Sequence, residues 1–359
     1  MPISTPKRTH PYDDQHLNAG SRPTVAADTL ITPTADFFTR SHATPPAIDA
    51  RAWRLEVGGL VDRPTHYSLA ELGARFERHE VTATLVCAGM RRAELLALGP
   101  LPGELPWEAD AAGTGVWTGF RLGDVLRAAG ARPEAAHVEF IGLDRVERHG
   151  HEFGFGGSID LAKALSDEVI LATHLNGAPL PREHGFPMRV LVPGWIGARQ
   201  IKWLGRLNVT AAPSDNYFQT MAYRVQREVN PDDPRDVTSG VAMTEVPVNA
   251  VIIAPGPRDV LKAGTTAVRG WAMGTGCAPV RTIEVSVDDG EWIAAHAIAD
   301  AGAWGWLFWE AVVELAVGMR IVRVRARDGT TAMPATIDET WNVKGYGNNA
   351  WHQVRVEVV

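Results

Sequence analysis

The feature that most constrains the fold of this 359-residue chain is a change of pattern near residue 237. Beyond it, apolar and polar residues alternate along short runs that are separated by turn signals. The clearest runs are Val246 to Ile252, Ile283 to Val287, Val322 to Ala326 and Val354 to Val358. Alternation with a period of two is typical of strands with one face in a core and one in solvent. Residues 238–359 are therefore predicted to form an all-β sandwich.

Residues 1–237 have a different texture, with both helical and strand signals. Ser68 to Glu71 is a capping box that predicts a helix start, and Arg121 to Ala129 is a short amphipathic segment. Val169 to Ala172 and Met188 to Val192 are apolar runs of the length of buried strands. The polar stretch 230–236, which contains two prolines, suits an extended connector. The chain is thus predicted to be α+β, with a mixed α/β domain over 1–237.

The charge balance limits the kinds of partner. Lys and Arg number 35 against 42 Asp and Glu, a net charge of -7 that argues against nucleic acid or an anionic membrane surface. The arginines that alternate with valines over 322–327 are interpreted as the solvated side of a strand rather than a docking face. Residues 1–22 show no secretion or twin-arginine signal, and the C-terminus carries no peroxisomal signal. No apolar run reaches the length needed to span a membrane. A cytoplasmic location is therefore expected.

The chain has two cysteines, Cys87 and Cys277. Two cysteines cannot supply a disulfide scaffold, a cysteine-rich zinc site or an iron–sulfur cluster, and no haem-attachment motif is present. Cys87 is followed within five residues by Arg91 and Arg92, whose charges favour the thiolate form needed in a metal ligand or a nucleophile. A buried core cysteine is the plainer alternative. Spacing alone leaves these interpretations open.

Several motifs in a fixed order resemble one family, from about Asp36 to the C-terminus. They are Phe37-Phe38-Thr39-Arg40-Ser41-His42, Cys87-Ala88-Gly89-Met90-Arg91-Arg92, Asn176-Gly177, His184-Gly185-Phe186-Pro187-Met188-Arg189, Val192-Pro193-Gly194, Gly197-Ala198-Arg199-Gln200-Ile201-Lys202-Trp203-Leu204, Trp341-Asn342-Val343-Lys344-Gly345 and Asn349-Ala350-Trp351-His352. In these motifs the sequence resembles the sulfite oxidase family of molybdopterin enzymes. That family pairs a mixed α/β molybdopterin domain with an immunoglobulin-like dimerisation domain, here expected over 238–359.

The resemblance implies a molybdenum-molybdopterin cofactor. Cys87 is then the protein thiolate on the metal, and one cysteine suffices because the cofactor brings other sulfurs. The positions implied to hold the pterin and its phosphate are His42, Asp144, His184, Arg189, Arg199 and Lys202. Cys277 matches no ligand motif and is taken as structural.

The resemblance also implies the substrate pocket and the reaction. Arg40, Arg92 and Lys344 form the implied anion pocket, with Trp107 as an apolar wall and Tyr223 near the metal. The implied reaction is the oxidation of sulfite to sulfate by oxygen-atom transfer, with electrostatic stabilisation by the three cations. Lys344 stands where animal and plant sulfite oxidases have arginine. Lysine keeps the positive charge, but it cannot bind an oxyanion through two parallel hydrogen bonds as a guanidinium does.

The partners follow from the same resemblance. The expected ligands are sulfite and other small anions. No His-Pro-Gly-Gly haem motif occurs in the sequence, so the electron acceptor is expected to be external, either oxygen or a cytochrome such as cytochrome c. The sandwich half implies a homodimer, with Lys344 reaching the active site from that half.

Three rival interpretations remain. The same cofactor also serves nitrate reduction and the chemistry of other sulfur oxyanions or S-oxides, although a cation at Lys344 together with Tyr223 favours sulfite. A non-catalytic binding protein built on the immunoglobulin-like half would contain no molybdenum. A cysteine hydrolase would leave the histidine and arginine motifs without a role.

Overall fold

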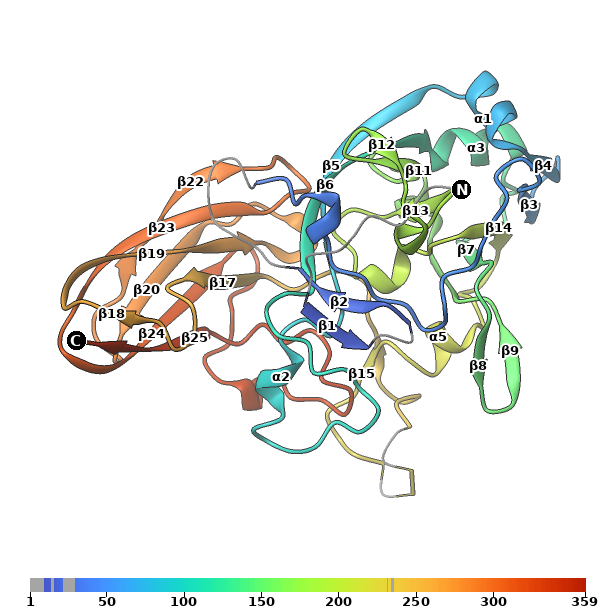
Figure 1. Ribbon diagram of the computed structural model, residues 1–359. Coiled ribbons are helices and arrows are strands. Elements are labelled where there is room, and N and C mark those ends of the chain that lie inside the picture. The colour runs from blue at the N-terminus through green and yellow to red at the C-terminus, as the bar shows by residue number, and fades with distance from the viewer. Residues whose placement is uncertain (1–9, 14–15, 22–29, 231, 234–235) are drawn as a thin grey trace.

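The computed structural model describes residues 10–13, 16–21, 30–230, 232–233 and 236–359, which form two strand-rich halves that lie side by side (Figure 1). The prediction about targeting, which concerns residues 1–22, falls largely outside the described residues. So do both prolines of the expected connector, Pro231 and Pro234. In the described part of the chain, no helix has the length and apolar character needed to cross a membrane.

The first half is built on two sheets. One has the strand order β10-β7-β14-β3-β4, in which β14 and β3 are parallel and the other pairs antiparallel. Its strands are β3 (Leu55–Gly59), β4 (Thr65–Tyr67), β7 (His137–Gly142), β10 (Gly156–Asp160) and β14 (Leu204–Thr210). The other is antiparallel in the order β12-β11-β6-β5, with β13 beside β11. Its strands are β5 (Arg78–Val86), β6 (Ala112–Arg121), β11 (Ile170–Leu175), β12 (Ala178–Pro179) and β13 (Arg189–Leu191).

The helices of this half are short. They are α1 (Leu69–Arg75), α2 (Arg92–Leu95), α3 (Leu122–Ala129), α4 (Leu161–Ala164) and α5 (Tyr217–Thr220). The predicted capping box is confirmed: Glu71 N donates to Ser68 Oγ at 3.2 Å, and Ser68 N donates to the Glu71 carboxylate at 2.7 Å. Helix α3 ends at Gly130, directly after the amphipathic segment seen in the sequence, and the φ of 73° there suits a residue without a side chain.

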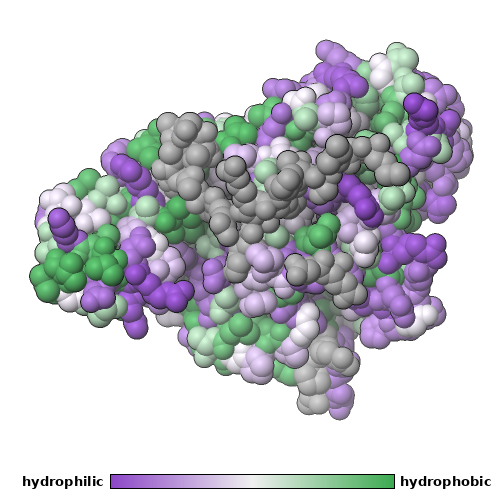
Figure 2. Space-filling model, viewed as in Figure 1, coloured by the Kyte–Doolittle hydropathy of each residue, from purple (hydrophilic) through white to green (hydrophobic). Residues whose placement is uncertain are grey.

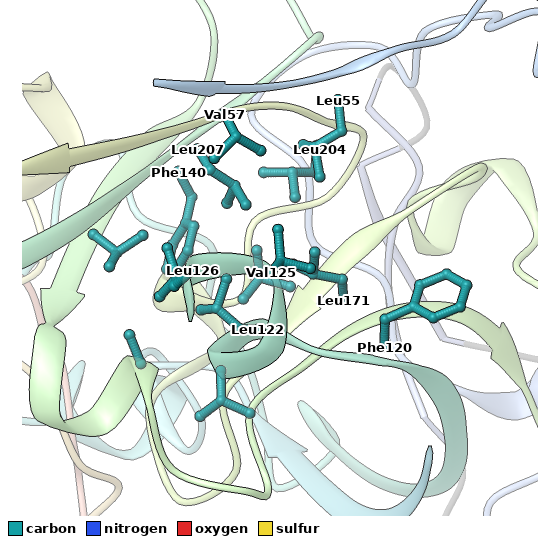
Figure 3. Close-up of a cluster of buried hydrophobic side chains, with 14 of the residues drawn as sticks. Leu55, Val57, Phe120, Leu122, Val125, Leu126, Phe140, Leu171, Leu204 and Leu207 are labelled. Carbon is teal, nitrogen blue, oxygen red and sulfur yellow. The ribbon is translucent and has the colours of Figure 1, made fainter. Parts of the chain in front are cut away.

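A hydrophobic core fills the space between the two sheets and α3 (Figure 3). Helix α3 contributes one apolar face, and strands of both sheets contribute the rest. The residues labelled in Figure 3 are Leu55, Val57, Phe120, Leu122, Val125, Leu126, Phe140, Leu171, Leu204 and Leu207. This core includes Ile201 and Leu204, on either side of Lys202 at the start of β14. Cys87, which follows β5, belongs to a separate buried cluster.

The second half is the expected sandwich of a four-stranded and a five-stranded sheet, in the orders β17-β19-β23-β22 and β18-β25-β24-β20-β21. Its strands are β17 (Asn249–Ala254), β18 (Val260–Leu261), β19 (Gly264–Met273), β20 (Thr282–Val287), β21 (Ile293–Ala294), β22 (His296–Asp300), β23 (Leu307–Leu315), β24 (Gly318–Arg327) and β25 (His352–Val358). The predicted alternation is confirmed, because the apolar residues of β20, β24 and β25 point into one core.

The arginines of β24 form the solvated side of that strand, as predicted. Arg323 pairs with Asp289 at 2.5 Å, and Arg325 pairs with Glu284 on the neighbouring strand β20 at 2.8 Å. Each of these two positive charges therefore has an acidic neighbour, which argues against a basic docking face.

The two halves share a hydrophobic core. Phe37 and Leu85 of the first half belong to the same buried cluster as Val251, Trp271 and Trp306 of the sandwich. Main-chain contacts continue this packing, since Thr84 N in β5 donates to the carbonyl of Trp304 at 2.9 Å. The strand that leads into Cys87 is thus held from both sides.

Three two-stranded ribbons and several 3-10 turns complete the described chain. The ribbons are β1 (His10–Asp13) with β2 (Asn18–Gly20), β8 (Val146–Arg148) with β9 (His151–Phe153), and β15 (Arg224–Val225) with β16 (Val241–Ala242). Figure 2 shows apolar residues gathered at the end of the sandwich near the C-terminus. Val260, Val317, Met319 and Val359 are each more than half exposed there.

Candidate functional site

A cavity whose space, open solvent included, is about 710 Å³ gathers most of the predicted site residues. Its lining comes from the ends of several strands and the segments between them, which are far apart in the sequence. Eight of the twelve predicted residues line it: Arg40, His42, Cys87, Asp144, His184, Arg189, Lys202 and Tyr223. We call it the inner cavity.

A second, larger cavity, of about 1220 Å³ with open solvent included, adjoins the first. It shares Arg40, His42, Cys87 and Tyr223 with the inner cavity and adds Arg92 and Lys344. We call it the outer cavity. The two spaces meet at Cys87, so a group bound at this thiol would face both.

Cys87 follows directly after β5 and is buried. Its amide donates to the carbonyl of Ala111 at 2.9 Å, and its own carbonyl accepts from Met90 N at 3.0 Å. Burial raises the pKa of the Cys87 thiol, and the positive charges of Arg92 and Arg40 oppose that shift only in part. The charge of Arg92 thus favours the thiolate, as expected, but burial outweighs it and the net shift of the pKa is upward.

Arg91 turns away from Cys87. Its φ of 63° lies in the left-handed region, and its guanidinium donates to both carboxylate oxygens of Glu94, at 2.8 and 2.7 Å, and to Asn249 Oδ1 at 2.8 Å. Asn249 lies on β17 of the sandwich. Of the two arginines, Arg91 therefore joins the loop after Cys87 to the second half, while Arg92 faces the outer cavity.

Arg92 is held between two glycines. A Cβ on Gly89 would lie 2.5 Å from the guanidinium, and one on Gly345 would lie 2.8 Å from Arg92 Cγ. Arg92 Nε donates to the carbonyl of Lys344 at 2.8 Å, and Nη1 donates to that of Leu105 at 2.9 Å. This packing fixes the guanidinium beside Lys344, which the sandwich half contributes between β24 and β25.

Tyr223 and His42 form a hydrogen-bonded pair where the cavities meet. The phenol oxygen lies 2.7 Å from His42 Nε2, and the Tyr223 ring stacks on Tyr346 with centroids 5.2 Å apart. Burial raises the pKa of Tyr223, and burial together with the charges of Arg40 and Arg148 lowers the pKa of His42. At neutral pH the phenol therefore keeps its proton and the imidazole is neutral.

The inner cavity is bordered by buried cations. Burial lowers the pKa of Arg189 to about 9 and that of the neighbouring Arg199 to about 10. Neither pairs with a carboxylate among the described residues, and the Nε atoms of both and Nη2 of Arg199 have no hydrogen-bond partner there. Lys202 Nζ donates to Ser41 Oγ at 2.8 Å and to the Glu183 carbonyl at 2.9 Å.

The remaining predicted residues lie as follows. Asp144 accepts from Phe155 N at 2.9 Å, and burial raises its pKa. His184 is buried against the Phe37 ring. Arg199 lies behind the inner cavity, where Nη1 donates to the carbonyl of Phe218 at 2.9 Å. Trp107 lines neither cavity and is buried against Tyr12, with ring centroids 4.4 Å apart.

Three residues of the site were not predicted from the sequence. Ser41 binds Lys202, Tyr346 stacks on Tyr223, and the Glu104 carboxylate lies between Arg92 and Lys344. Ser41 lies within one of the motifs given above and Tyr346 directly after another, so their position next to predicted site residues could have identified them. A lone acidic residue in a loop such as Glu104 carries no such signal.

Family models match both halves of the chain. Residues 42–218 match the oxidoreductase molybdopterin binding domain, and residues 241–359 match the Mo-co oxidoreductase dimerisation domain.

Individual proteins give a consistent result. The chain is 37% identical over 349 residues to the sulfite oxidase of Gallus gallus, an alignment that covers 94% of this chain and 75% of that protein. It is 36% identical to the mitochondrial sulfite oxidase of Homo sapiens, covering 95% of this chain and 64% of that protein. The crystal structure of the sulfane dehydrogenase SoxCD from Paracoccus pantotrophus superposes with a TM-score of 0.80, over 98% of this chain and 88% of that one. At 23% sequence identity, this last match shows the fold.

Proposed function

Because the chain belongs to the sulfite oxidase family of molybdopterin-dependent oxidoreductases, we propose that it oxidises sulfite to sulfate and passes the electrons to an acceptor outside the chain. The observation that carries this proposal is the meeting of two cation-lined cavities at one buried thiol, Cys87. The inner cavity suits an anionic cofactor, and the outer cavity suits a small anionic substrate that approaches the same point.

The residues of the inner cavity fit a pterin that carries a phosphate. A buried guanidinium without a carboxylate partner is costly. The free donor of Arg189 would be satisfied by an anionic ligand in the inner cavity, and Arg199 would add positive charge from behind it. Cys87 is the proposed thiolate ligand of the metal. When bound, the cofactor supplies a redox-active molybdenum that exchanges an oxygen atom with the substrate. The residues proposed to hold the pterin are His42, Asp144, His184, Arg189, Arg199 and Lys202.

Replacing Arg189 by methionine, which keeps the bulk and removes the charge, should lower cofactor retention. The molybdenum bound per purified chain is expected to fall about tenfold, because charge-assisted hydrogen bonds to an anionic group are lost. The rise in unfolding temperature that the cofactor gives should shrink accordingly. Elemental analysis and thermal unfolding with and without cofactor provide the measurements.

Arg206→Met is the matched control for this variant, because Arg206 is half exposed and pairs with Glu56 on the outer side of the sheet. It should leave molybdenum content unchanged. Full retention of molybdenum in the Arg189 variant would show that this guanidinium does not contact the cofactor.

The outer cavity provides the substrate contacts. Arg40, Arg92 and Lys344 converge on it, and their charges are proposed to bind the oxyanion and to stabilise negative charge that develops on its oxygens. Tyr223 acts as a hydrogen-bond donor rather than a base, since its raised pKa keeps the proton on the phenol. His42 holds that phenol in place at 2.7 Å. Trp107 is proposed to support the cavity wall from behind.

A steady-state assay tests the activity. Purified protein is expected to reduce ferricyanide or cytochrome c when sulfite is supplied, and a parallel measurement of oxygen consumption decides between the two classes of acceptor. Nitrate is offered with a reduced viologen as electron donor. Nitrate turnover without sulfite turnover would reject sulfite as the substrate in favour of the nearest alternative.

We also propose a homodimer formed through the sandwich half, with the boundary between the two domains at residues 237 and 238. The second family model is described as a dimerisation domain, and the end of the sandwich exposes apolar side chains that a second copy can cover. Light scattering should give twice the chain mass of 38.9 kDa. The cytoplasmic location stays a prediction, which cell fractionation can check, since some relatives are named as mitochondrial proteins.

A further inference from the structure

An acidic side chain lines the proposed substrate pocket. Glu104 lies in the loop between α2 and β6, and its two carboxylate oxygens bridge two cations. Oε2 is 3.3 Å from Arg92 Nη2, and Oε1 is 3.4 Å from Lys344 Nζ. The side chains of Glu104, Arg92 and Lys344 are 14, 4 and 15% exposed, so solvent screens their contacts only weakly.

The carboxylate binds the two cations as an oxyanion would, with one oxygen on each. One of the two cations is fixed in place. Arg92 is clamped by Gly89 and Gly345 and donates to two main-chain carbonyls, one of which belongs to Lys344. A small anion that uses these cations must therefore displace the Glu104 carboxylate or share them with it.

The charge of Glu104 also reaches the rest of the site. It raises the pKa of Cys87 and that of Tyr223, in both cases as a smaller cause than burial. Arg40, which also lines the cavity, pairs with no carboxylate among the described residues; its guanidinium contacts Asn18, Ser41 and His42. Of the three cations proposed to bind the substrate, two are thus partly neutralised and one is not.

We propose that Glu104 is a specificity-determining residue, an internal anion that competes with small oxyanions for Arg92 and Lys344 and so limits their affinity for the pocket. The inference rests on the proposed function, because it assigns these cations to substrate binding. Its consequence is weak retention of the product, since sulfate meets the same competing carboxylate when it occupies the pocket.

The test replaces Glu104 by glutamine, which keeps the shape and removes the charge. Sulfate is the probe, and its dissociation constant is measured by titration calorimetry on the holoenzyme at fixed ionic strength. Glu104→Gln is expected to bind sulfate at least about tenfold more tightly, because a charge in direct contact with both cations is removed. The KM for sulfite should fall by a similar factor, while kcat changes by less than about threefold. Glu104→Ala should show the same direction if the glutamine variant folds poorly.

The matched control is Glu108→Gln, which makes the same charge change on the same loop at an exposed side chain. It should leave the sulfate affinity within about twofold of the wild type, because distant exposed charges are screened. Equal effects of the two variants would overturn the inference, since net charge alone would then explain them. Weaker sulfate binding in Glu104→Gln would also overturn it, because Glu104 would then be needed to hold the cations.

Failure of the inference and failure of the proposed function remain distinguishable. Sulfate binding requires no turnover. Tighter sulfate binding without any sulfite oxidation would uphold the competition and reject the activity. Sulfite oxidation with unchanged sulfate binding in Glu104→Gln would uphold the activity and reject the competition.

Discussion

Cys87→Ser is expected to abolish sulfite turnover, lowering kcat/KM by about 10³-fold or more, since even residues that only support a metal ligand are worth 10- to 100-fold. A serine hydroxyl is a hard, weakly acidic donor, and the metal needs the soft thiolate that the proposed cofactor site offers at this one position. The measurements are the steady-state rate with sulfite and the molybdenum content of the purified variant.

Cys277→Ser provides the internal control. Cys277 lies in the sandwich half, its Sγ contacts the carbonyl of Trp304 at 3.5 Å, and burial raises the pKa of its thiol to about 12. This variant should turn over sulfite like the wild type. Undiminished activity in the Cys87 variant would refute the assignment of the metal ligand, whatever the control shows.

Glu94→Ala is expected to destabilise the fold by about 3 kcal/mol, because it leaves a fully buried guanidinium without its carboxylate. Arg91 is 0% exposed and would retain only Asn249 Oδ1 as a side-chain acceptor. The free energy of unfolding from urea titration is the measurement. Removing both charges, in Arg91→Met with Glu94→Ala, should recover part of the loss, since no buried charge then remains unpaired.

The effect of Glu94→Ala should depend on pH. Burial opposes ionisation of Glu94, but the charge and hydrogen bonds of Arg91 dominate together and hold its pKa below the ordinary value of 4.5. A native pKa below the unfolded one gives stability that is complete above the unfolded value and is lost as pH falls through the native value. The difference between wild type and variant should therefore be constant down to about pH 5 and shrink below it.

Arg323→Ala is the control for this pair. It breaks the ion pair with Asp289, whose carboxylate is 77% exposed, so the cost should stay below about 1 kcal/mol. If Glu94→Ala lowered the free energy of unfolding no more than this surface variant, the contact between Arg91 and Glu94 would not stabilise the interface between the two halves.

The sandwich could be predicted from the sequence because period-two alternation depends on burial of one strand face. Val322, Val324 and Ala326 are buried where the pattern placed them, and the intervening arginines are on the outer side. The start of α1 could also be predicted, since a capping box is a local arrangement whose two hydrogen bonds span three residues. Such features need no knowledge of the distant chain.

The site was predictable only as a set of motifs, because its geometry depends on distant contacts. The sequence could not separate the roles of Arg91 and Arg92. A left-handed backbone at Arg91 turns its side chain toward Glu94 and the sandwich, while the charge of Arg92 acts on Cys87. Trp107 was expected on the cavity wall, but Tyr12 covers it from a distant segment of the chain. The role of Glu104 depends on Lys344, which lies 240 positions later in the chain.

The core shared by the two halves has a consequence for folding. Trp271 and Trp306 of the sandwich pack in one cluster with Phe37 and Leu85, and the main chain of β5 is bonded to Trp304. Cooperative units follow buried contacts rather than sequence boundaries. We therefore expect that the sandwich cannot be removed without damage to the first half, because truncation after residue 237 would expose apolar surface beside Cys87. After a single cleavage in the connector, we expect the two fragments to stay associated and to unfold in one transition.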